Sequence, residues 1–196
     1  INGINRELNA GAEQLHRVSW LLVTFGTAYV YSLRETGKVV ANCHKLPASL
    51  FDRRRVGVDE MLRGWIPLIE RLSDSNPELR IMFTVSPIRH LRDGAHENQL
   101  SKSVLLLFVD ELCRMYPDRC IYFPSYEIVM DELRDYRFYT EDMLHISPQG
   151  IEYIWEKFQS LYMTSATEAW MKRIDKINKT LLHRPTDPDS SVYQEL

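Results

Sequence analysis

The sequence predicts an α/β fold of three layers, in which helices cover both faces of a doubly wound parallel sheet. Short runs of β-branched and aromatic residues alternate along the chain with longer amphipathic segments, and glycine or proline ends each run. The composition agrees, because 44% hydrophobic residues in a chain of 196 can bury a substantial core in one domain.

The first part of the chain contains two predicted helices with one strand between them. Apolar residues recur every three to four positions over residues 1–17, which predicts a helix. Residues 18–25 are mostly β-branched, leucine or aromatic, which is typical of a strand buried on both faces, and a turn at Gly26 ends it. One apolar face over residues 56–72 predicts an amphipathic helix.

The rest of the chain repeats the order of strand, loop and helix. Residues 79–85 form the second predicted strand and residues 120–123 the third, each closed by a nearby proline. A helix over residues 101–116 lies between them. A last core helix begins at Ser147-Pro148, because serine is a favourable N-cap and proline suits the first helical position.

The predicted sheet has fewer strands than most natural sheets. Three strands are visible, whereas sheets usually have about four to six. The chain also opens at Ile1 rather than at methionine, so we expect one or two strands to precede the numbered sequence. We predict a domain over residues 1–163, followed over residues 164–196 by a lysine-rich helix and a polar tail.

Charge, hydropathy and cysteine content exclude several classes of protein. Lysine and arginine total 24 against 27 aspartates and glutamates, a net charge of −3, which predicts no nucleic-acid partner. No apolar run approaches the roughly 18 residues of a membrane-spanning helix. Cys43, Cys113 and Cys120 are too few and too irregularly spaced for a disulfide framework or a zinc site, which favours a reducing compartment and a cytoplasmic location.

The polar loops at one edge of the predicted sheet are the expected place for a ligand. Ligands of open α/β sheets bind beyond the carboxyl ends of the strands, here the loops over residues 26–47, 86–100 and 124–148. Four of the six histidines lie in these loops: His44, His90, His96 and His145.

An Asp-x-x-His pattern occurs twice in these loops, at Asp93/His96 and at Asp142/His145. A carboxylate three residues before an imidazole can accept a hydrogen bond from Nδ1 and leave Nε2 free as a general base. Asp142/His145 stands directly before a capped helix, whereas Asp93/His96 follows a flexible turn. The sequence therefore favours Asp142 and His145 as the catalytic pair, with a surface ion pair as the alternative for either match.

Three ordered blocks of sequence carry a family resemblance. They are residues 23–31 with 39–47, residues 84–90 with 93–102, and residues 122–145. Together they resemble the GSCFA domain family, a relative of the SGNH/GDSL hydrolases, over about residues 15–162.

The resemblance implies a flavodoxin-like hydrolase in which a serine attacks an ester, with His145 as the base and Asp142 as its partner. Gly26 matches the glycine whose N–H helps to hold the oxyanion, and Thr27 beside it is a further candidate. The Gly-Ser-Cys-Phe-Ala segment that would carry the serine is not in this sequence. We therefore expect the nucleophile to precede Ile1, and we expect this chain alone to be inactive.

The third oxyanion donor of the SGNH relatives has no clear counterpart in this sequence. The segment after the second strand lacks a Gly-x-Asn-Asp motif, so the donor would be Arg89, His90, Asn42 or nothing. His44 completes the set of substrate-binding candidates. An arginine could also clamp a carboxylate or a phosphate, and the alternative for Arg89 is an ion pair with an acidic residue, Asp135 or Glu97.

The leading hypothesis is a serine esterase or acyl hydrolase that acts on a small-molecule or carbohydrate ester and needs no cofactor and no metal. A second hypothesis is a non-catalytic domain that holds an anion or a sugar with Arg89, His90 and the loop at Asn98-Gln99. A third is metal-assisted hydrolysis by ligands drawn from histidines 44, 90 and 96 and aspartates 93 and 142, although no recognisable metal-ligand spacing supports it.

Overall fold

The computed structural model describes residues 2–43 and 45–182. The chain forms two compact units, Ile1–Ile151 and Glu152–Leu196, and each is considered by itself. The predicted division, residues 1–163 and 164–196, stays a prediction, and the tail after Leu182 lies outside the described residues. Among the described residues, no helix combines the length and the apolar character needed to cross a membrane.

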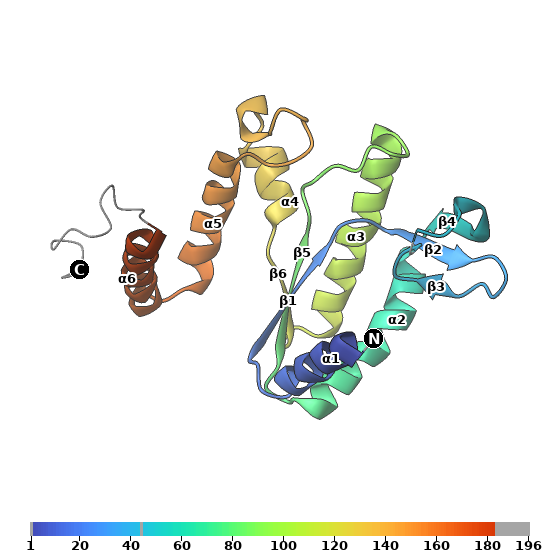
Figure 1. The fold of residues 1–196 in the computed structure, drawn as a ribbon, viewed down its shortest axis with the longest axis horizontal. Helices are drawn as coiled ribbons and strands as arrows, with labels where there is room; N and C mark the ends of the chain where they lie inside the picture. The colour runs from blue at the N-terminus through green and yellow to red at the C-terminus, as the bar shows by residue number, and fades with distance from the viewer. Residues whose placement is uncertain (1, 44, 183–196) are drawn as a thin grey trace. The chain divides into compact units, whose positions relative to one another are not determined.

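A parallel sheet of three strands forms the centre of the first unit (Figure 1). Its order is β1 (Trp20–Phe25), β5 (Arg80–Val85) and β6 (Cys120–Tyr122). Trp20 pairs with Arg80 at one end of the β1–β5 ladder. These are the three strands expected from the sequence, so the prediction of an α/β fold with a parallel sheet is confirmed.

Five long helices accompany the strands in the described part of the chain, and each was expected from the sequence. They are α1 (Asn2–Leu15), α2 (Val58–Ser75), α3 (Ala95–Met115), α5 (Pro148–Tyr162) and α6 (Ser165–Leu182). Helix α3 begins at Ala95 rather than at the predicted Ser101. Short helical turns occupy the remaining connections: η1 (Ala48–Leu50), α4 (Ser125–Glu127), η2 (Ile128–Glu132) and η3 (Tyr136–Phe138).

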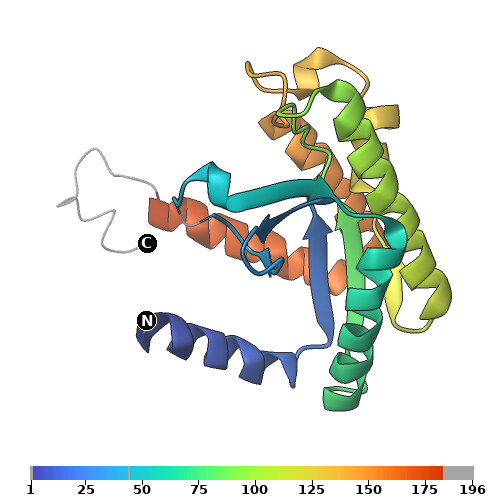
Figure 2. The same ribbon diagram turned by 90° about the vertical axis from the view of Figure 1, so that its right-hand side faces the viewer.

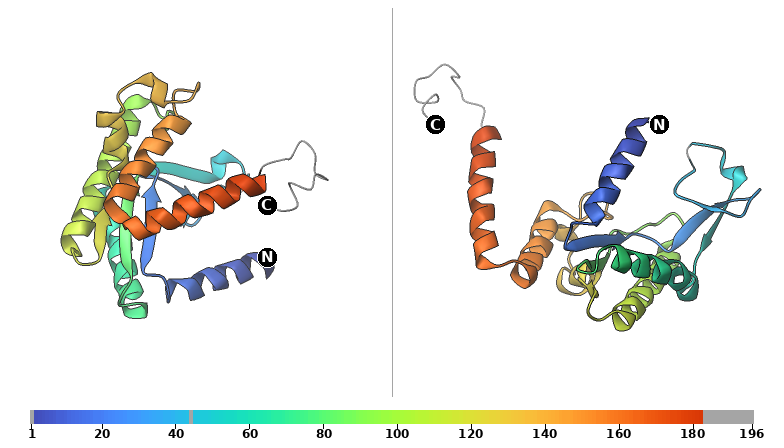
Figure 3. Two further views of the ribbon diagram at one scale, coloured as in Figure 1. Left: turned by 90° about the vertical axis from the view of Figure 1, so that its left-hand side faces the viewer. Right: turned by 90° about the horizontal axis from the view of Figure 1, so that it is seen from below.

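Helices α2 and α3 pack together on one face of the parallel sheet, as Figures 2 and 3 show. Four aromatic rings meet at the centre of this core, and the centroids of the closest pair, Phe25 and Trp65, are 5.1 Å apart in an edge-to-face arrangement. Phe83 and Phe108 complete the cluster. Such pairs contribute beyond the area that they bury, and they fix α2 and α3 against the strands.

Two large apolar side chains of β1 are exposed. Trp20 is 39% exposed and Leu22 is 57% exposed, although both lie on strand β1. The prediction of helices on both faces is confirmed for the face that α2 and α3 cover, and for the other face it stays a prediction. A run of apolar residues does not say which face of a strand is covered, because it indicates burial without naming the partner.

Strands β1 and β5 pair directly and in parallel, from Trp20↔Arg80 to Phe25↔Val85. The described strands therefore form a parallel α/β sheet in the order β1-β5-β6. The flavodoxin-like arrangement that the family resemblance implies stays a prediction.

A second, antiparallel sheet was not expected from the sequence. It consists of β3 (Val39–Val40), β2 (Tyr29–Leu33) and β4 (Phe51–Arg55), in that order. The prediction treated residues 26–47 as a polar loop, which is wrong for β2 and β3. Their strand character depends on pairing with β4, which a local pattern does not show.

Two arginines of β4 form ion pairs with acidic side chains of other elements. The guanidinium of Arg53 lies 4.0 Å from the centroid of the Tyr29 ring and forms an ion pair with Asp93. Arg54 pairs with Glu60 at 2.6 Å. These contacts attach the second sheet to the elements of the first.

Two leucines on α3, two residues apart and therefore on different faces of the helix, test how the core is assembled. Leu105 is fully buried, whereas Leu107 is 60% exposed. We expect Leu105→Ala to lower the free energy of unfolding by about 2–5 kcal/mol and Leu107→Ala to change it by less than about 0.5 kcal/mol. Urea unfolding measures both, and equal effects would contradict the packing of α3 against the sheet.

Candidate functional site

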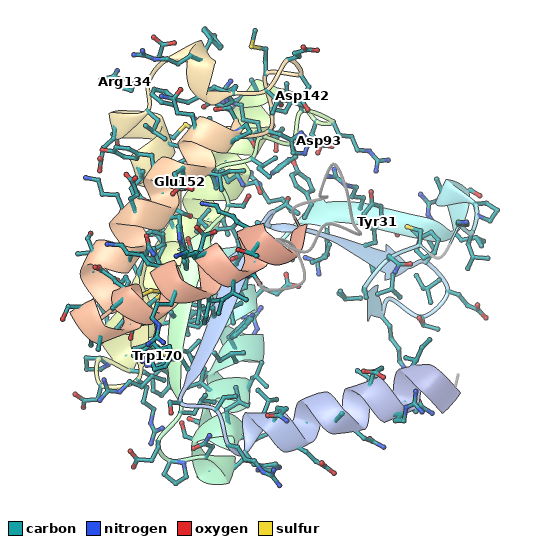
Figure 4. The ribbon with its side chains drawn as sticks, turned by 60° about the vertical axis from the view of Figure 1, so that its left-hand side comes forward. Tyr31, Asp93, Arg134, Asp142, Glu152 and Trp170 are labelled. Atoms are coloured by element: carbon teal, nitrogen blue, oxygen red, sulfur yellow. The ribbon has the colours of Figure 1, made fainter. Side chains whose placement is uncertain are left out.

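Asp142 and His145 lie on a short hairpin-like loop between η3 and α5. Tyr139 and Ile146 form an isolated antiparallel bridge at its base. Inside this bridge, the backbone N–H of Thr140 donates to the carbonyl of His145 at 2.9 Å. Figure 4 shows Asp142 on this loop, at the same end of the first unit as Asp93. The loop therefore closes through its own backbone.

One carboxylate oxygen of Asp142 accepts hydrogen bonds from the loop, and the other contacts the imidazole of His145. Oδ1 accepts hydrogen bonds from the backbone N–H groups of Leu144 and His145, at 2.8 and 2.9 Å, and from the hydroxyl of Thr140 at 2.7 Å. Oδ2 lies 2.5 Å from Nδ1 of His145. The backbone N–H of His145 and then the Thr140 hydroxyl hold the pKa of Asp142 well below its usual range.

The ionised Asp142 determines which nitrogen of His145 is available. A neutral imidazole that meets a carboxylate at Nδ1 carries its proton there, which leaves the lone pair on Nε2. The side chain of His145 is 61% exposed. No hydrogen bond links Nε2 to any residue that the structure describes. The pair therefore has the arrangement of a general base and its orienting carboxylate.

The other Asp-x-x-His match does not form such a pair. Asp93 forms its ion pair with Arg53 instead. His96 lies exposed in the first turn of α3. The structure thus separates two patterns that the sequence could rank only by position.

A buried lysine that the sequence analysis did not select joins the carboxyl ends of β1 and β5. Lys102 of α3 is 1% exposed, and its Nζ donates to the carbonyls of Gly26 at 2.7 Å and Ser86 at 2.6 Å. Burial lowers the pKa of Lys102 to about 8. An ammonium group thus lies where the two strands separate.

The lysine occupies the point at which the β1–β5 ladder stops. The N–H of Ser86 donates to the carbonyl of Phe25 at 2.9 Å, so the next bond of a parallel ladder would run from the Thr27 N–H to the Ser86 carbonyl. The Nζ of Lys102 donates to the Ser86 carbonyl instead. Because the carbonyl of Gly26 also points at Lys102, the N–H of the same peptide, that of Thr27, points the opposite way.

Ser101, the neighbour of Lys102, fixes the next residues of the same turn. Its Oγ is fully buried, accepts a hydrogen bond from the N–H of Ala28 at 2.8 Å, and lies 3.2 Å from the hydroxyl of Thr27. Gly26 and Thr27, both predicted site residues, are therefore held from two adjacent positions of α3.

Arg89 and His90 follow β5, beside the Gly26–Thr27 turn. The Nη2 of Arg89 donates to the hydroxyl of Tyr139 at 3.2 Å. The alternative of an ion pair with Asp135 or Glu97 is therefore wrong, because Arg89 pairs with neither residue. His90 donates its backbone N–H to Asn98 at 3.1 Å. Burial and then the charge of Lys102 lower the pKa of His90 below its usual value.

The remaining predicted site residues lie elsewhere or cannot be placed. Asn42 is exposed and follows β3, so it belongs to the second sheet. His44 lies outside the described residues. Among residues 2–43 and 45–182, no three histidine, cysteine, aspartate or glutamate side chains gather in a way that could hold a metal ion.

Comparison with known families identifies the chain. The GSCFA family matches residues 1–158, most of the sequence. The chain belongs to the GSCFA family. Comparison with curated proteins and with solved structures gives no match. Membership names no reaction, so the chemistry of this GSCFA domain has to be argued from the site itself.

The lysine of the GSCFA domain makes its stability depend on pH in a defined direction. An unfolded lysine has a pKa of about 10.4, whereas that of folded Lys102 is about 8. Between these values the unfolded chain binds more protons, so the folded state gains stability as pH rises. Relative to Lys102→Met, we expect the wild-type protein to gain roughly 1–3 kcal/mol between about pH 7.5 and about pH 10. A pH-independent difference in urea unfolding would refute this.

Gly150, near the start of α5, supports the Asp142–His145 loop of the GSCFA domain by close approach. A Cβ at this position would lie 2.6 Å from Cγ2 of Ile146 and 3.1 Å from the carbonyl of Phe138. We expect Gly150→Ala to cost about 1–3 kcal/mol in thermal unfolding. The matched control is Gly64→Ala in α2, where a Cβ meets nothing within 4 Å. There we expect a gain of about 0.5–1 kcal/mol, and a similar change in both variants would contradict the argument.

Proposed function

We propose that this GSCFA domain is the base-bearing part of an SGNH-like serine esterase or acyl hydrolase that acts on a small-molecule or carbohydrate ester. The observation that carries the proposal is the Asp142–His145 pair. An ionised carboxylate 2.5 Å from Nδ1, itself fixed by two backbone N–H groups, orients an imidazole whose Nε2 faces solvent. This is the arrangement that activates a hydroxyl nucleophile.

In the proposed reaction, Nε2 of His145 accepts the proton of the nucleophilic serine as its Oγ attacks the ester carbonyl. The imidazolium that forms is stabilised by Asp142, which stays ionised because its pKa is low. His145 then returns the proton to the leaving alkoxide, and a water molecule, deprotonated in the same way, hydrolyses the acyl group from the serine. No described hydroxyl or thiol is hydrogen-bonded to Nε2 of His145. The labelling experiment below therefore has to identify the nucleophile.

The turn after β1 supplies the proposed oxyanion donor. The N–H of Thr27 points away from Lys102, and its peptide is fixed by the hydrogen bond from Nζ to the Gly26 carbonyl. A preorganised N–H of this kind stabilises the developing negative charge without reorganisation. Gly26 and Thr27 therefore have a supporting role in the proposal.

The test is fluorophosphonate labelling of the full-length protein of this reading frame, followed by peptide mass mapping, together with the hydrolysis rate of p-nitrophenyl acetate. We expect a labelled serine. We expect His145→Ala to abolish labelling and to lower the hydrolysis rate at least about 10²-fold, and Asp142→Asn to lower the rate roughly 10²–10⁴-fold.

His96→Ala is the matched control, because His96 belongs to the other Asp-x-x-His pattern but is exposed and not paired with its aspartate. We expect it to label and hydrolyse as the wild-type protein does. If His145→Ala labelled and hydrolysed normally in a folded protein, the assignment of His145 as the base would fail. If the folded wild-type protein gave no label, a binding domain without turnover would replace the esterase proposal.

A further inference from the structure

A cavity of about 210 Å³ lies beside the Asp142–His145 loop, and no pattern in the sequence indicated it. Its walls come from the segment after β5 and from the segment between β6 and the loop. The lining residues are Arg89, Val129, Met130, Leu133, Arg134, Asp135, Tyr136 and Tyr139. A liquid water occupies about 30 Å³, so the space suits a small organic group rather than a single ion.

Two of the lining residues carry positive charge that nothing nearby neutralises. Among the residues that the structure describes, neither Arg89 nor Arg134 forms an ion pair. The one acidic lining residue, Asp135, is already engaged, because its carboxylate accepts from the N–H of Arg137 at 2.9 Å and lies 3.7 Å from Nε of that arginine. The cavity is therefore cationic.

Aromatic side chains hold and border these guanidinium groups. The guanidinium of Arg89 lies 4.9 Å from the centroid of the Tyr139 ring and donates to the Tyr139 hydroxyl. The ring of Tyr136, which is 67% exposed, lies 6.2 Å from that of Tyr139 at the rim. Arg89 is thus preorganised, and a planar or ring-shaped ligand would find an aromatic wall.

The floor of the cavity is apolar and is shaped by an unusual turn. The N–H of Leu133 donates to the carbonyl of Ile128, five residues earlier, at 3.0 Å, so residues Ile128–Glu132 form one turn of π-helix. Val129 and Leu133 on this turn are 1% and 3% exposed. Single π-helical turns are frequent at functional sites, because the wider turn reshapes the surface around it.

The cavity and the proposed base share one short segment. Tyr139, which lines the cavity, forms the backbone bridge with Ile146, the residue after His145. Figure 4 shows Arg134 and Asp142 on the loops at the same end of the sheet. A substrate held in the cavity would therefore extend toward the catalytic pair.

From these contacts we infer that the cavity binds the anionic end of the substrate. The ligand class is an oxyanion of the carboxylate or phosphate type, attached to a ring or a short carbon chain, with Arg89 and Arg134 as its partners. That the bound anion is a substrate rests on the proposed esterase function. The binding of the anion itself can be measured without turnover.

The first test measures binding of benzoate and of inorganic phosphate to the full-length protein by isothermal titration calorimetry. We expect both anions to bind, and Arg134→Gln and Arg89→Gln to weaken binding at least about tenfold. Tighter binding of benzoate would identify a carboxylate ligand, and tighter binding of phosphate a phosphate ester. Arg71→Gln on α2 is the matched control. Arg71 is exposed and lies outside the cavity, and its substitution removes the same charge.

Equal weakening by Arg71→Gln and Arg134→Gln, or no binding to the wild-type protein, would overturn the inference. Because Arg134 is exposed, its substitution does not threaten the fold.

The second test compares kcat/KM for mono-p-nitrophenyl glutarate, which is anionic, with that for p-nitrophenyl acetate, which is neutral. We expect the ratio to fall in Arg134→Gln.

The two proposals fail in different ways. If hydrolysis depends on His145 but Arg134→Gln changes neither binding nor the kcat/KM ratio, the anion site is wrong and the esterase proposal stands. If the anions bind through Arg89 and Arg134 but no turnover depends on His145, the anion site stands and the esterase proposal is wrong.

Discussion

A buried ammonium group holds together the end of the parallel sheet on which the candidate site is built. Lys102 donates to the carbonyls of Gly26 and Ser86, where β1 and β5 separate. Burying a lysine without a carboxylate is costly, and its lowered pKa reflects that cost. The gain is in geometry, because the turn after β1 is fixed and the N–H of Thr27 is directed away from Lys102. The fold thus gives up stability where it needs a defined backbone direction.

The same end of the sheet combines positive charge with acidic groups that are already engaged. Lys102, Arg89 and Arg134 have no ion-pair partner among the described residues. Four acidic side chains nearby are each held by another group: Asp93 by Arg53, Glu97 by Tyr29, Asp135 by Arg137, and Asp142 by His145. The local field therefore favours anions, although the whole chain carries a net charge of −3.

Hydropathy patterns predicted the three parallel strands and the long helices, and the Asp-x-x-His spacing indicated the pair at Asp142 and His145. Neither pattern showed which polar residues are buried. The buried stripe of α3 includes Asn98, Ser101 and Lys102, which continue the spacing of its apolar residues toward the N-terminus. Polar side chains suggest solvent, so the helix was predicted to begin too late. The second sheet was missed for another reason: Tyr29 and Arg53 stack across β2 and β4, and no local pattern contains that contact.

The two halves of the candidate site differ in how far apart their contacts lie along the chain. Asp142 and His145 are three residues apart, and the loop that holds them is closed by a bond between Thr140 and His145. The bond from Lys102 to Gly26 joins residues 76 positions apart. Closing a short loop costs little chain entropy, whereas the long connection forms only when the sheet and α3 have assembled. During folding, we therefore expect the Asp142–His145 loop to form before the turn at Gly26 is fixed, so assembly of the sheet completes the candidate site.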